Sequence, residues 1–271
     1  MNPYENVGAD PEKVLFQEIN TIANNLGRAR KQGDKSQENI YSEELEKKWK
    51  YFCDHLENPA YGTSFTADDL LNIDLALKTA GEDEKIIYLY NNIIEKIPES
   101  SEMIVALGHI YRDKGEFAKA ATLYEDGIRK KIKFLEENYN INLADLRYGI
   151  FQYLESKQIP QVLDLADYKR HYSQSLNGCD KNLEALTEIK DAILFYQNAK
   201  TERCDAYEVL GDIQLKLNNL EKAKDAYKKA LQLFNKLQNQ NTEDYFEAEK
   251  RPRISGWIDV MEVEKKLKKM E

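Results

Sequence analysis

Residues 204–234 read CDAYEVLGDIQLKLNNLEKAKDAYKKALQLF, and this stretch decides the fold of the chain. In each half of it, apolar residues recur three to four positions apart, which places them on one face of an α-helix. Gly211 and Ala223 are small where the two helices would cross, and Tyr207 and Tyr227 would fill the space around them. The stretch therefore predicts a helical hairpin whose outer faces need neighbouring helices.

The same pattern occurs earlier in the chain. A shift of 34 residues superposes residues 67–100 on residues 101–134, so that glycines, tyrosines and aliphatic residues coincide. The coincident pairs are Gly81 and Gly115, Glu82 and Glu116, Leu89 and Leu123, Tyr90 and Tyr124, and Ile94 and Ile128. Because one hairpin cannot bury both of its faces, a repeated hairpin predicts a stacked array.

The spacing resembles that of the tetratricopeptide repeat, which has a period of about 34 residues, a Leu-Gly pair and aromatic, Ala and Pro positions. Leu107-Gly108 and Leu210-Gly211 are the Leu-Gly pairs here, whereas the copy at 67–100 has Asp74 in place of the glycine. The resemblance implies an all-α fold. It would be a right-handed superhelical array of antiparallel helix pairs, a TPR-like α-solenoid, with extra helices at both ends.

The chain divides into three parts on this pattern. Residues 1–66 hold N-terminal helices that we expect to cap the array, with a separate binding element as the alternative. Residues 67–238 form the array, with clear repeats at 67–100, 101–134 and 204–238. The irregular segment 135–203 has room for two hairpins, and we expect a helix opening at Asn142 to pair with one beginning at Pro160. Residues 239–271 form C-terminal capping helices.

The composition argues against several classes of protein. A net charge of −9 and a pI near 5.2 disfavour a nucleic-acid binder. The three cysteines lie far apart and lack CxxC spacing, which disfavours a zinc site or a disulfide framework. No apolar run is long enough to span a membrane, and the first residues lack the basic and apolar regions of a signal peptide. We therefore expect a cytoplasmic protein with no membrane span and no nucleic-acid partner.

No pattern typical of catalysis stands out. The three histidines, His55, His109 and His171, have no metal-ligand spacing, and adjacent acids such as Asp68-Asp69 are typical of solvated helix faces. We therefore expect no enzymatic activity, no metal and no cofactor. The alternative is an enzyme with a deep pocket beside His109 or His171.

The resemblance also implies a function. In tetratricopeptide repeats the first helix of each hairpin lines the inner, concave surface, which holds a peptide or a partner helix. The matching positions are Leu71, Leu75, Lys78, Val105, His109, Arg112, Asp205, Glu208, Asp212 and Leu215. These residues change from apolar and basic to acidic along the array, which favours a protein partner with apolar anchors and a basic segment.

We therefore expect a non-catalytic scaffold or adaptor. The alternative is a structural subunit that forms a homo-oligomer through the array ends, with Trp257, Ile258 and Met261 as the contact patch.

Overall fold

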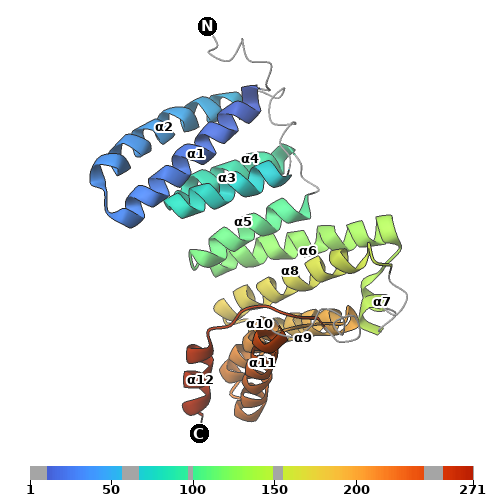
Figure 1. The fold of residues 1–271 in the computed structure, drawn as a ribbon. Helices are drawn as coiled ribbons and strands as arrows, with labels where there is room; N and C mark the ends of the chain where they lie inside the picture. The colour runs from blue at the N-terminus through green and yellow to red at the C-terminus, as the bar shows by residue number, and fades with distance from the viewer. Residues whose placement is uncertain (1–10, 57–66, 97–99, 149–154, 241–252, 271) are drawn as a thin grey trace. The chain divides into compact units, whose positions relative to one another are not determined.

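The computed structural model describes residues 11–56, 67–96, 100–148, 155–240 and 253–270 (Figure 1). Its contacts divide the chain into two compact units, Met1–Glu99 and Ser100–Glu271, and each is described by itself. In the described residues the fold is all-α apart from one short pair of strands. The predicted fold class of paired helices is therefore confirmed.

The first unit contains α1 (Pro11–Gln32), α2 (Lys35–Leu56), α3 (Ala67–Ala80) and α4 (Asp83–Lys96). α1 packs against both α2 and α3. The apolar stripe of α1 is buried, with Leu15, Ile19, Ile22, Ala23 and Leu26 all inside. The ring of Phe52 on α2 lies with its centroid 6.0 Å from that of Phe16 on α1. That α1 and α2 cap the array stays a prediction.

The second unit contains α5 (Ser101–Asp113), α6 (Phe117–Tyr139), α7 (Leu143–Tyr148), α8 (Ile159–Gly178), α9 (Asn182–Asn198), α10 (Cys204–Lys216), α11 (Leu220–Gln240) and α12 (Val260–Lys268). Three hairpins follow one another along the chain: α5–α6, α8–α9 and α10–α11 (Figure 1). The first helix of each later hairpin packs against the second helix of the one before, α8 against α6 and α10 against α9. One apolar core consequently runs from Val105 on α5 to Ile213 on α10.

Five hairpins of the described residues share the same turn. In each, a residue with a left-handed backbone precedes one whose N–H donates to the carbonyl five residues earlier, which is the Schellman arrangement. The left-handed residues are Gly33, Gly81, Gly115, Asp180 and Asn218. The hydrogen bonds run from Asp34 to Ala29, Glu82 to Leu77, Glu116 to Tyr111, Lys181 to Leu176 and Asn219 to Gln214. The turn thus identifies α1–α2 and α8–α9 as hairpins of the same construction, although neither follows the sequence repeat.

Some expectations need correction. α8 pairs with α9, not with a helix that opens at Asn142; that region holds the short α7, which contacts α9. Two strands were not predicted: β1 (Thr201–Arg203) and β2 (Arg253–Ser255) pair in parallel and are each three residues long, too short to show a period. α6 extends beyond the repeat boundary and ends at Tyr139. Residues 241–252, part of the segment predicted to form C-terminal capping helices, lie outside the described residues.

The close crossing expected at Gly211 is present. A Cβ built on Gly211 would lie 2.5 Å from Cε1 of Tyr227, and one built on Gly108 would lie 3.0 Å from Cε1 of Tyr124. Both tyrosines are fully buried. In both hairpins the backbone of the first helix therefore rests directly on a tyrosine ring of the second.

Substituting Gly211 with Ala should destabilise the second unit, because the Tyr227 ring would have to move. We expect the free energy of unfolding to fall by about 1–3 kcal/mol, as for other overpacked cores. Gly108→Ala is the matched variant: its Cβ has more space, and alanine favours a helix interior by about 1 kcal/mol over glycine. Urea unfolding followed by circular dichroism measures both, and equal losses would contradict the crossing geometry.

Candidate functional site

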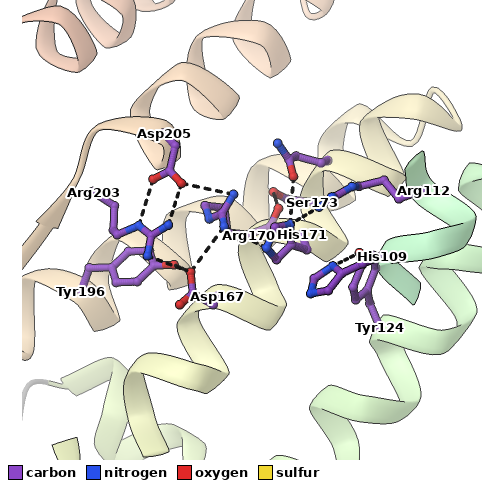
Figure 2. Close-up of polar contacts among 11 residues, drawn as sticks. His109, Arg112, Tyr124, Asp167, Arg170, His171, Ser173, Tyr196, Arg203 and Asp205 are labelled. Atoms are coloured by element: carbon purple, nitrogen blue, oxygen red, sulfur yellow. Dashed lines mark hydrogen bonds and ion pairs between the residues drawn. The ribbon is translucent and has the colours of Figure 1, made fainter. Parts of the chain in front are cut away.

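The first helices of the three hairpins in the second unit carry a connected set of polar side chains (Figure 2). α5 contributes His109 and Arg112, and α10 contributes Asp205. α8 contributes Asp167, Arg170, His171 and Gln174, whose spacing of three, four and seven residues places them on one helix face. Tyr124 on α6, Tyr196 on α9 and Arg203 on β1 complete the set.

Tyr124 joins α5 to α8. Its hydroxyl lies 2.6 Å from His109 Nδ1 and is hydrogen-bonded to it. The Tyr124 ring stacks on His171, with centroids 5.9 Å apart and planes at 17°. The two imidazoles meet edge to face, with centroids 4.4 Å apart. The two histidines, distant in sequence, therefore share one aromatic cluster with a buried tyrosine.

His171 lies between two arginines. Arg170 Nη2 donates to His171 Nε2 at 2.8 Å, and Arg112 Nη1 contacts His171 Nδ1, which also lies 3.2 Å from Gln174 Oε1. Burial lowers the pKa of His171 well below its usual range, and the charges of Arg170, His109 and Arg112 lower it further. The imidazole is consequently neutral at physiological pH.

Asp205 anchors the other end of the network on α10. Arg203 donates to both of its carboxylate oxygens, from Nε at 3.0 Å and from Nη2 at 2.7 Å, and Arg170 Nη1 lies 3.4 Å away. Burial by itself would raise the pKa of Asp205, but the hydrogen bond from Arg203 and the charge of Arg170 hold it below its usual range. Asp205 is therefore ionised at physiological pH, and its contact with Arg170 ties α8 to α10.

Asp167 of α8 connects this helix to α9 and is the second carboxylate that contacts both arginines. The Tyr196 hydroxyl donates to it at 2.6 Å, and both Arg170 and Arg203 pair with it at 3.4 Å. Arg170 is almost completely buried, and its Nε has no hydrogen-bond partner among the described residues. The arginine is thus held mainly by its two terminal nitrogens.

The remaining acids of α10 contact the C-terminal helix. Tyr227 donates its hydroxyl proton to Asp212 Oδ1 at 2.6 Å, the counterpart of the Tyr124–His109 contact in the first hairpin. Lys266 of α12 donates to the same oxygen at 2.7 Å, and its Nζ lies 3.7 Å from Glu208. Burial raises the pKa of Glu208. The predicted partner-binding acids Glu208 and Asp212 are therefore engaged by the chain's own lysine.

The other predicted residues occupy different environments. Val105 is 3% exposed, and a Cβ on Gly127 would lie 2.5 Å from its Cγ2, so Val105 packs in the core and offers no contact surface. Leu215 is partly buried against the α11–α12 core. Leu75 is 63% exposed and Lys78 is exposed, both on α3 of the first unit. The side chain of Leu71 lies outside the described residues.

The sequence pattern did not predict the α8 residues or Lys266 as part of the site. The repeat pattern fails between residues 135 and 203, so α8 was not aligned with the other first helices. The shared turn supplies the missing register: Asp180 and Asn218 are 38 residues apart, and the same shift places Asp167 under Asp205 and Arg170 under Glu208. The lysines of α12 lie in the last turn of a helix, where the helix dipole alone favours cations, so their spacing does not indicate a partner.

A groove of about 290 Å³ lies between α9, α10 and α11, lined in part by Lys190, Tyr207, Leu210, Lys222 and Lys229. Neither histidine lines this groove, so it is not the pocket that the enzyme alternative requires. No group of three or more potential ligands that could hold a metal ion occurs in the part of the chain that the structure describes. Within those same residues, no helix has the length and apolar character that crossing a bilayer demands.

The depressed pKa of His171 predicts a pH-dependent stability. In the unfolded chain the imidazole takes up a proton near pH 6.5, whereas in the folded chain it does so only at lower pH, so acid favours unfolding. Between pH 7 and pH 5 this group should lower the free energy of unfolding by about 1–2 kcal/mol. Unfolding midpoints of wild type and His171→Gln measured across that range test it: the difference between the two should change with pH below 6.5 and be constant above 7.5. A constant difference throughout would contradict the assignment.

Two comparisons with known proteins bear on this site. Family models described as Tetratricopeptide repeat match residues 101–129, which span α5 and the first half of α6, and residues 204–237, which span α10 and most of α11. No curated protein matches the chain. The matched segments are the two hairpins in which a Leu-Gly pair crosses a buried tyrosine. The chain therefore contains two tetratricopeptide repeats, at residues 101–129 and 204–237.

Proposed function

We propose that the chain is a non-catalytic scaffold or adaptor that holds a peptide or helix of another protein against the first helices of its hairpins. Tetratricopeptide repeats generally mediate protein–protein interactions through such surfaces. The observation that carries the proposal is the polar network from His109 to Asp205. Most of its members come from the first helices of three successive hairpins, and they are held in place by one another (Figure 2).

A network of this kind suits recognition because its side chains are already ordered. Arg112, for example, is bonded to Asp113 at 2.7 Å and contacts His171, yet 22% of its side chain remains exposed. A guanidinium held in this way loses little conformational freedom when it meets a carboxylate or a backbone carbonyl of a partner. Arg112 and His109 are therefore the contacts we propose on α5.

The charge of the first helices changes along the second unit. Arg112 is cationic on α5, whereas Asp205, Glu208 and Asp212 are anionic on α10. An extended partner would then present acidic or polar groups to α5 and a basic segment to α10. In the first unit, the exposed residues Leu75 and Lys78 of α3 are the contacts we propose; Leu71 stays a prediction. The net charge of −9 supports a protein rather than a nucleic acid as the partner.

Reversing the charge of Arg112 should weaken partner retention without unfolding the chain. We expect Arg112→Glu to reduce the amount of a specifically retained protein by at least about tenfold, the effect of roughly 1.4 kcal/mol of binding free energy. Quantitative mass spectrometry of proteins captured from the source cell on the full-length chain measures this.

Arg129→Glu is the matched control for that experiment. Arg129 is on the second helix of the same hairpin, 74% of its side chain is exposed, and it pairs with Asp126 one turn away. It should retain the partner at the wild-type level. If both variants lose the partner equally while their melting curves match wild type, the first-helix surface is not the binding site.

A second candidate function is that of a self-associating structural subunit. The observation that favours it is a pair of exposed apolar side chains, Trp257 and Met261, which are 72% and 81% exposed. Ile258, expected in the same patch, is instead buried against the last hairpin. The patch is therefore smaller than the sequence suggested.

Self-association through this patch predicts a mass above that of the monomer. In light scattering over a range of concentrations, the double variant Trp257→Ser, Met261→Ser should then be monomeric, while Leu183→Ser, which alters an exposed leucine of α9, should behave as wild type. A monomeric wild-type chain at all concentrations would reject this candidate and leave the adaptor.

A further inference from the structure

The C-terminal segment covers the last hairpin in three places. β2 pairs with β1 in parallel, with Thr201 opposite Arg253 and Arg203 opposite Ser255. Gly256 follows with φ of +101°, and a Cβ there would lie 2.5 Å from Asp205 Oδ1, so only glycine fits against this carboxylate. Ile258 and Val263 are then buried beside Tyr227 and Leu233 of α11. Residues 253–263 thus contact both helices of the last hairpin, α10 through Gly256 and α11 through Ile258 and Val263.

Lys266 completes the contact by charge. Its Nζ lies over the Tyr227 ring, 5.5 Å from the centroid, and reaches Asp212 at 2.7 Å and Glu208 at 3.7 Å. Two acids therefore share one lysine. Glu208 is also partly buried, so this pair of acids carries more negative charge than the one lysine of α12 neutralises.

α12 contacts α11, the helix against which the first helix of another hairpin would pack. α8 packs against α6, α10 packs against α9, and α12 packs against α11. It is, however, a helix of nine residues, whereas α10 has 13 and α8 has 20. The end of a repeat array must be covered, and here the covering helix is short.

We propose that residues 253–270 are a built-in ligand of the last repeat, and that the partner of this repeat is a basic amphipathic helix that takes the place of α12. This inference rests on the proposed function and specifies its partner. The required chemistry is that of α12: aliphatic residues one turn apart, as Val263 and Leu267 are, with a lysine between them. A second cation on the partner would pair with the acid that Lys266 reaches only at 3.7 Å.

The test uses a fluorescent synthetic peptide with the sequence of residues 253–271 as the probe and the full-length chain as the receptor. In wild type the site is occupied by the chain's own segment. In the double variant Val263→Asp, Lys266→Glu, that segment loses its buried anchor and its ion pair. We expect the probe to bind the double variant at least about tenfold more tightly than wild type in fluorescence anisotropy.

Three controls make the result decisive. Lys268→Glu changes an exposed lysine of the same helix and should bind the probe as wild type does. Lys266→Glu alone should change binding in the same direction as the double variant but less, which guards against misfolding of the latter. A probe carrying Lys266→Glu should not bind any of the chains at the concentrations at which the native probe binds the double variant.

Equal affinity of wild type and double variant for the probe, with unchanged amide protection in α5–α9, would overturn the proposal and make α12 a fixed cover. Binding of the Lys266→Glu probe at full strength would overturn it as well, since the acids of α10 would play no part. Neither outcome affects the Arg112→Glu experiment, which tests partner binding at the surface of α5. The further inference and the proposed function can therefore fail separately.

Discussion

The structure depends on one close contact, the crossing of a glycine backbone over a tyrosine ring. Gly211 lies against Tyr227 at a distance that leaves no space for a Cβ, and Gly108 lies almost as close to Tyr124. The whole tyrosine side chain is buried, and its hydroxyl is hydrogen-bonded to a polar residue of the first helix, His109 in one hairpin and Asp212 in the other. The same tyrosine thus sets the packing of the core and fixes a side chain of the candidate site.

This contact also explains what the sequence could reveal. Where glycine and tyrosine are both present, the hairpins were recognised and both were matched by the family models. In α8–α9 the equivalent positions hold Ser173 and Ile189, which are both fully buried. The Ser173 hydroxyl donates to the carbonyl of Arg170 and so needs no partner elsewhere. The hairpin fold is therefore present without the sequence pattern of the repeat. For the same reason, the polar residues of α8 could not be predicted from that pattern.

Other parts of the site depend on contacts between helices that no single helix pattern contains. Val105 occupies an inner-face position in the repeat but fills the space left by Gly127 of the facing helix. Lys266 approaches Glu208 and Asp212 from more than fifty residues away, and no local spacing foretells that pairing. The strands β1 and β2 are too short to show alternation. Helix existence and the turns are local properties, which is why they were predictable, whereas the pairing of side chains across hairpins is not.

Buried cations connect each hairpin of the second unit to the next. Lys131 of α6 is almost completely buried and donates to Gln161 and Asp164 of α8 at 2.7 and 3.0 Å. Arg170 of α8 reaches Asp205 of α10. A buried charge tolerates the loss of its partner poorly, but a matched exchange of both is far less costly. These pairs should therefore be inherited together, so that when relatives of this chain diverge, position 131 will change in step with 164, and position 170 in step with 205.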